Sequence, residues 1–136
     1  MHMNIDPYNF VSSLNCVLAQ RLVRTICPDC KAPYKYDKEF LEYSKINLDE
    51  HKDYKFFKGK GCINCNGSGY RGRTAIFELL RFTDSIKELV TSKPSYSALK
   101  RAAKEQGTIF LRDAAVEKAL KGITTLEDIN RVTFVE

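Results

Sequence analysis

Two short stretches decide the fold of this chain: Cys27-Pro28-Asp29-Cys30 and Cys62-Ile63-Asn64-Cys65. In each of them two residues separate the cysteines, so that a tight turn directs both sulfurs toward one ion about 2.3 Å away. The sequence does not open with the charged and then apolar order of a secretory signal peptide, and thiols of cytosolic proteins stay reduced. Cysteine pairs at this spacing favour a tetrahedral zinc site over the alternative of disulfides. We therefore expect one structural Zn²⁺, with the ligands Cys27, Cys30, Cys62 and Cys65.

The residues near these pairs refine that expectation. Gly67 and Gly69 follow the second pair and give the backbone the freedom to turn its N–H groups toward the thiolates. His51 lies between the two pairs, but four cysteines already complete a structural site, so we expect it to be a surface histidine. Cys16 stands apart, and nothing in its surroundings indicates reactivity.

The composition is that of an ordinary globular protein. Of 136 residues, 43% are hydrophobic and 29% are charged. A chain of this length buries roughly two thirds of its unfolded surface, which allows one domain or two small ones. No apolar run approaches the ~18 residues of a membrane-spanning helix, so we expect a cytoplasmic protein that is not inserted in a membrane. The net charge of +5 is spread along the chain and does not predict nucleic-acid binding.

The first part of the chain has the periodicity of an amphipathic helix. Apolar residues recur every three or four positions, at Val11, Leu14, Leu18, Leu22 and Ile26. This spacing predicts one helix from Pro7 to about Thr25, with Asp6 as its N-cap.

The rest of the chain predicts further helices and one short strand. The long insert between the cysteine pairs contains a short helix over 38–43 and a strand-like piece over 54–57. Residues 73–80 are rich in β-branched and aromatic side chains and predict a short strand. Helices are predicted over 84–90, 96–106, 109–121 and 124–131. Thr83 and Ser95 cap the first two, and a capping box from Thr124 to Glu127 opens the last.

Together these elements give an α+β fold that is mainly helical. It consists of an N-terminal amphipathic helix, a four-cysteine zinc module with a long insert, a short strand and a small C-terminal helical bundle.

Residues 67–74 nearly fit the phosphate-binding pattern G-x-x-x-x-G-K-[ST]. That pattern needs a lysine where this chain has Arg73, with a strand before the loop and a helix after it. Here a cysteine pair precedes the loop and a strand-like run follows it. The chain contains no convincing set of catalytic residues, so we do not expect it to hydrolyse ATP by itself.

Three motifs resemble one family in the order in which they occur. Residues 13–30, SLNCVLAQRLVRTICPDC, resemble the SL-x-x-V-x-AQRLVR-x-x-C-x-x-C segment of the type II secretion and type IV pilus assembly ATPases, the GspE/PilB family. Residues 61–74 resemble the GC-x-x-C-x-x-x-GYRGR segment of that family, and residues 122–132 resemble its G-x-TT-x-E-x-x-x-RV segment. One departure is Asn15, where the family has a basic residue.

The resemblance implies that the chain is the C-terminal portion of such an ATPase. Residues 1–26 would then be the tail helix of the ATPase core, 27–72 the zinc module, and 73–136 a strand with the helical bundle. The full-length relative is a hexamer that binds ATP and Mg²⁺ and drives pilin or pseudopilin assembly through an inner-membrane platform protein, at the cytoplasmic face of that membrane. Tyr70, Arg71 and Arg73 are expected to be exposed contact residues for a neighbouring subunit or the platform, with local pairing to Glu78 or Asp84 as the alternative.

Two other classes of protein fit parts of the sequence. A free-standing zinc module that contacts nucleic acid or a protein would account for the cysteine pairs alone. A thiol-disulfide enzyme would place one redox pair at a helix N-terminus after a strand, and neither pair has that predicted context.

Overall fold

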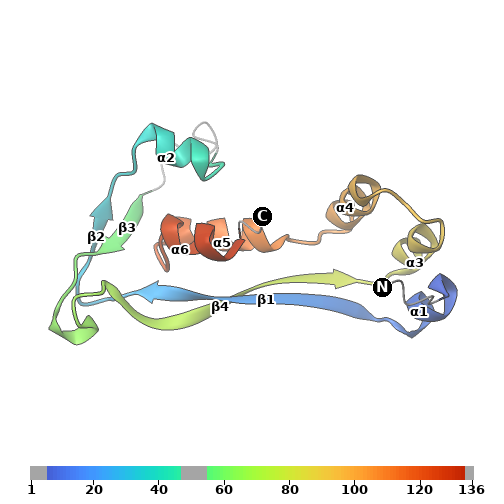
Figure 1. Ribbon diagram of the computed structural model, residues 1–136, viewed down its shortest axis with the longest axis horizontal. Coiled ribbons are helices and arrows are strands. Elements are labelled where there is room, and N and C mark those ends of the chain that lie inside the picture. Colours follow the sequence, from blue (N-terminus) through green and yellow to red (C-terminus); the bar gives the residue numbers. More distant parts are fainter. Residues whose placement is uncertain (1–5, 47–54, 134–136) are drawn as a thin grey trace. The chain divides into compact units, whose positions relative to one another are not determined.

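The computed structural model describes residues 6–46 and 55–133 and divides the chain into two compact units. One unit contains residues 1–19 and 77–110, and the other contains residues 20–76 and 111–136. The strands β1 (Cys16–Ile26) and β4 (Tyr70–Arg81) pair in a two-stranded sheet, drawn as the long blue and yellow-green ribbons of Figure 1.

The predicted long N-terminal helix is wrong beyond Ser13. Helix α1 (Pro7–Ser13) begins as expected, because the Asp6 carboxylate accepts hydrogen bonds from the N–H groups of Tyr8 and Asn9. Leu14 is extended, and β1 follows. The apolar spacing had suggested a helix, but pairing with β4 satisfies the backbone of this segment as a strand.

The strand predicted at 73–80 is confirmed, and it is longer than expected, since β4 has 12 residues. The insert contains an antiparallel hairpin of β2 (Lys31–Tyr34) and β3 (Phe56–Gly59), of which the first strand was not predicted. Lys31 pairs with Gly59 and Tyr34 with Phe56. Between these strands, helix α2 (Lys38–Tyr43) has the predicted bounds, with Asp37 as its N-cap.

The four later helices are present, but they fall into two pairs and not one bundle. Helices α3 (Asp84–Thr91) and α4 (Tyr96–Glu105) belong to the first unit, in which α1 and α4 each contact α3. Helices α5 (Leu111–Leu120) and α6 (Leu126–Thr133) pack against each other in the second unit. The Ser95 side chain caps α4 as predicted.

Helix α6 begins at Leu126, one residue later than the capping box at Thr124 predicted. The N–H group of Asp128 donates to Thr125 Oγ1 at 3.3 Å, so Thr125 is the capping residue. The Thr124 hydroxyl is buried and has no hydrogen-bond partner among the described residues.

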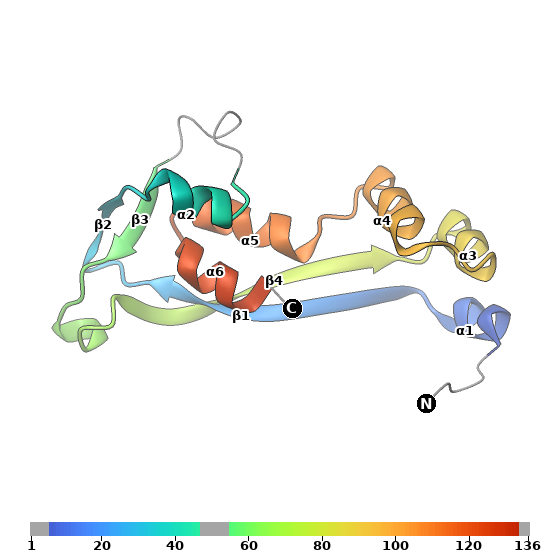
Figure 2. The same ribbon diagram turned by 45° about the horizontal axis from the view of Figure 1, so that its top comes forward.

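The hydrophobic core of the second unit combines elements that are far apart in the sequence. Figure 2 shows α2, α5 and α6 of this unit beside the β2–β3 hairpin. The core combines side chains from β1, β4, α5, α6 and the segment from Tyr36 to Ile46 that contains α2: Val23, Tyr36, Leu41, Ile46, Ile76, Ala115, Ala119, Leu126 and Ile129. This packing holds the two cysteine-bearing turns, which lie at the ends of β1 and β4. No helix in the described ranges is long and apolar enough to cross a membrane.

Candidate metal centre

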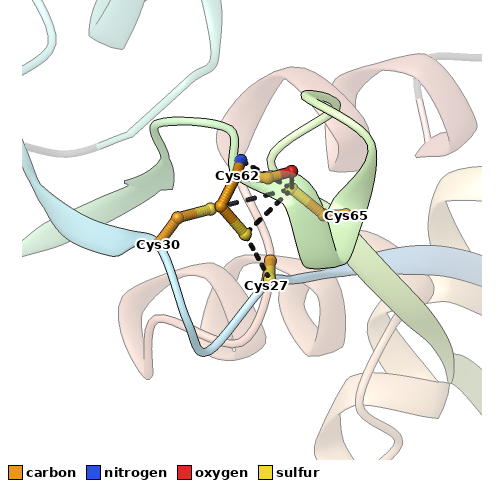
Figure 3. Close-up of side chains that lie close together, drawn as sticks. All are labelled: Cys27, Cys30, Cys62 and Cys65. Atoms are coloured by element: carbon orange, nitrogen blue, oxygen red, sulfur yellow. Dashed lines mark hydrogen bonds between the residues drawn. The ribbon is translucent and has the colours of Figure 1, made fainter.

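The structure brings the four predicted cysteines together. Cys27 directly follows β1, Cys30 directly precedes β2, and Cys62 and Cys65 lie at the two ends of the 3₁₀ turn η1 (Ile63–Cys65). Their four Sγ atoms lie within 4.8 Å of one another, and Figure 3 shows the side chains pointing into one space. The group is therefore close enough to hold a metal ion.

The sulfur–sulfur distances fit a tetrahedral ion. Four sulfurs bound at about 2.3 Å around one ion lie about 3.8 Å from each other. The Sγ atoms of Cys27 and Cys62 are 3.8 Å apart, those of Cys30 and Cys65 3.9 Å, and those of Cys62 and Cys65 3.6 Å. A disulfide requires about 2.05 Å, and all four cysteines are free thiols.

Backbone N–H groups stabilise a thiolate at Cys65. Its sulfur accepts from the N–H of Cys62 at 3.2 Å and from the N–H of Gly69 at 3.3 Å. Burial opposes ionisation, but these hydrogen bonds outweigh it and lower the pKa of Cys65 to about 6. The expected role of the glycines after the second pair is thus present at Gly69.

Cys30 has the opposite tendency. Burial, followed by contacts with the other three cysteines, raises the pKa of its thiol to about 12. Four sulfurs this close cannot all be negatively charged unless a cation lies among them. The donor set therefore favours a soft divalent cation that binds thiolates.

Close backbone approach fixes the loops around the sulfurs. A Cβ atom at Gly69, which has φ +75°, would lie 2.5 Å from the carbonyl oxygen of Gly59. One at Gly61 would lie 2.6 Å from the carbonyl oxygen of Gly67. Gly59 and Gly61 were not singled out from the sequence, because their importance depends on a loop that returns only after the second cysteine pair.

Asp29 joins the first cysteine turn to the second. Its carboxylate accepts from Asn64 Nδ2 at 2.9 Å and from the Arg71 guanidinium at 3.1 Å. This role of Asp29 was not predicted, although Asp29 lies between the two cysteines of the first pair. Arg71 is exposed as predicted, and its local partner is Asp29.

Tyr70 is not the exposed contact residue that was expected. Its hydroxyl lies 2.7 Å from Thr125 Oγ1, and the Arg24 guanidinium stacks 4.0 Å from the centre of its ring. Tyr70 is half-buried and joins β4 to α6, whereas Arg73 is exposed.

The remaining candidate residues lie away from the cluster. Cys16 is exposed on β1. His51 lies outside the described residues. Residues 67–69 follow the turn η1 and residues 70–74 already belong to β4, so the strand predicted after the second cysteine pair is confirmed.

Comparison with known proteins identifies the family. The family described as Type II/IV secretion system protein matches residues 1–131. The chain is 43% identical over 131 residues to the Type II secretion system ATPase E of Vibrio cholerae, covering 96% of this chain and 25% of that protein. It is 40% identical over 127 residues to the Type IV pilus assembly ATPase PilB of Thermus thermophilus, covering 93% of this chain and 14% of that protein.

A third relative, the Type II secretion system protein E of Pseudomonas aeruginosa, is 40% identical over 134 residues, which cover 98% of this chain and 26% of that protein. The chain thus spans about a quarter of the length of these relatives, or less. These similarities confirm the family that the three sequence motifs indicated. The chain belongs to the type II/IV secretion system protein family.

Proposed function

We propose that this chain is the zinc-binding, non-catalytic portion of a secretion or pilus-assembly ATPase. The observation that carries the proposal is the cluster of four Sγ atoms within 4.8 Å, at distances that suit tetrahedral Zn²⁺. The ligands are Cys27, Cys30, Cys62 and Cys65. Four thiolates leave no coordination position for water, so the ion stabilises structure and does not act as a Lewis acid.

The role in the full-length protein is to position other parts. In this proposal, the ATPase core that precedes the zinc module binds ATP and Mg²⁺ within a homo-hexamer. The module, residues 27–72, contacts a neighbouring subunit or an inner-membrane platform protein, and the machine assembles pilin or pseudopilin subunits at the cytoplasmic face of the membrane. The names of the relatives, which are secretion and pilus-assembly ATPases, support this assignment.

Metal content tests the zinc site. We expect the purified chain to contain about one zinc per molecule by elemental analysis. Cys62→Ser should lose the zinc and unfold at a lower temperature, because structural zinc contributes apparent binding energies on the order of 10 kcal/mol to folding. Cys16→Ser is the matched control, since Cys16 is an exposed cysteine outside the cluster. A chain without stoichiometric metal, or a Cys62→Ser variant as stable as the control, would refute the site.

Charge reversal tests the positioning role in the full-length protein. Arg71→Glu places a negative charge on the exposed surface beside the second cysteine pair. Arg21→Glu is the control, because it reverses the charge of another exposed arginine that lies outside residues 27–72. We expect Arg71→Glu, but not the control, to reduce hexamer assembly or the ATPase rate. Equal behaviour of both variants would show that Arg71 is not at an interface.

A further inference from the structure

Three arginines surround a pocket in the second unit. The pocket has a volume of about 490 Å³ and is lined by Leu22, Arg24, Arg73 and Arg131. Leu22 and Arg24 are two residues apart on β1 and so lie on the same face of the strand, while Arg73 comes from β4 and Arg131 from α6. None of these residues belongs to the cysteine cluster.

A buried carboxylate orients two of the arginines. The Asp128 side chain is fully buried and accepts hydrogen bonds from the backbone N–H of Arg24 at 2.6 Å and from Arg24 Nε at 2.7 Å. It also accepts from Nε and a terminal nitrogen of Arg131, at 3.3 Å and 3.1 Å. These contacts leave guanidinium N–H groups of both arginines available. The Arg24 side chain is 45% exposed and the Arg131 side chain is 59% exposed.

The pocket retains excess positive charge. Arg73 is exposed and forms no ion pair with a residue that the structure describes. Three guanidinium groups against the single carboxylate of Asp128 leave two positive charges around the pocket. Stacking on Tyr70 restricts the Arg24 side chain further, so less conformational entropy is lost when that side chain binds a ligand.

We propose that this pocket binds a phosphate group of a small ligand. Guanidinium groups present planar pairs of donors that match phosphate oxygens, and a phosphate monoester carries about two negative charges at neutral pH. The volume is within the range of pockets that hold small molecules, and it exceeds what a single carboxylate needs. A nucleotide, inorganic phosphate and a lipid headgroup share this chemistry. The proposal does not depend on the zinc site, since it uses no cysteine.

A titration of the chain followed by NMR tests the pocket. Inorganic phosphate, ATP and phosphatidylglycerol vesicles are added separately at low ionic strength, because screening by salt weakens such contacts. We expect saturable shifts at the residues that line the pocket. Arg73→Gln should weaken binding about tenfold, the effect of losing one charge-assisted hydrogen bond. Far-UV circular dichroism checks that this variant retains its fold, as expected for an exposed residue.

Arg21→Gln is the matched control. Arg21 is an exposed arginine on β1, the strand that pairs with the strand of Arg73, and it does not line the pocket. Its substitution should change the affinity less than twofold. If ATP binds more tightly than inorganic phosphate, the site is assigned to nucleotides, and if both bind equally, it is assigned to free phosphate. If only phosphatidylglycerol vesicles bind, and this binding depends on Arg73, the site is assigned to lipid headgroups. No saturable binding to any of the three, or equal losses in both variants, would overturn the proposal.

Discussion

The backbone N–H group of Arg24 donates a 2.6 Å hydrogen bond to the carboxylate of Asp128, which lies 104 residues later in the chain. Asp128 is in the first turn of α6, where the helix dipole favours a negative charge. The carboxylate thus connects β1 to α6. It has to satisfy its hydrogen bonds within the protein, because it is fully buried.

Replacement of Asp128 by asparagine should destabilise the second unit. The amide has nearly the same shape but only one acceptor oxygen, so an N–H group of Arg24 or Arg131 loses its partner. We expect a loss of about 2 kcal/mol in the free energy of unfolding, measured by urea denaturation. Asp113→Asn, an exposed acid in the first turn of α5, should stay within about 0.5 kcal/mol of the original protein. A loss in Asp128→Asn no larger than in this control would contradict the role of the carboxylate.

The contribution of Asp128 should depend on pH. Burial raises the pKa of Asp128, but the hydrogen bonds from Arg24 and Arg131 outweigh burial and place that pKa below its ordinary value. A carboxyl group with a lowered pKa in the folded state stabilises the fold above its unfolded pKa of about 3.9, and this stabilisation is lost as the pH falls further. The difference in unfolding free energy between the original chain and Asp128→Asn should therefore be constant from neutral pH to about pH 5 and shrink below about pH 4. A difference that does not change on acidification would show that Asp128 has an ordinary pKa.

Alanine substitutions at Gly67 and Gly69 should separate steric contact from backbone strain. Both glycines have φ +75°, so either alanine costs about 1 to 2 kcal/mol for a left-handed conformation. The Cβ at position 67 meets nothing within 4 Å, whereas at position 69 it would lie 2.5 Å from the Gly59 carbonyl oxygen. Gly69→Ala should therefore lower the melting temperature and the metal content more than Gly67→Ala. Equal effects would mean that the two loops do not approach each other as closely as described.

Removal of the Tyr70 hydroxyl should weaken the contact between β4 and α6. Tyr70→Phe loses the 2.7 Å hydrogen bond to Thr125 and should cost about 1 kcal/mol in unfolding free energy. Tyr70→Leu also removes the ring on which Arg24 stacks and should cost more. Tyr8→Phe serves as the control, because Tyr8 is 69% exposed. If Tyr70→Phe is as stable as Tyr8→Phe, the hydroxyl contact contributes nothing to folding.

Local features of the structure were predictable from the sequence. The cysteine turns and the caps at Asp6 and Ser95 depend on residues within four positions of each other, and all of them are present. Helix α2 has its predicted bounds for the same reason. Short-range chemistry decides these features almost independently of the rest of the chain.

Features that depend on distant partners were not predictable. The segment that forms β1 contains leucine, alanine, glutamine and arginine, which favour helices in isolation, and its partner strand begins only at Tyr70. Pairing with that strand overrides the local preference. The contact between Asp128 and Arg24 likewise requires the complete fold, so neither residue stood out as important in the sequence.

The discontinuous second unit has a consequence for protein synthesis. Its two segments are separated by residues 77–110, which the ribosome translates in about 2 to 7 s. During that time Val23 and Ile76 have no access to Leu126 and Ile129, with which they later share a core. The nascent chain therefore exposes apolar surface until α6 emerges, and chaperones that bind apolar segments have their best opportunity in that interval.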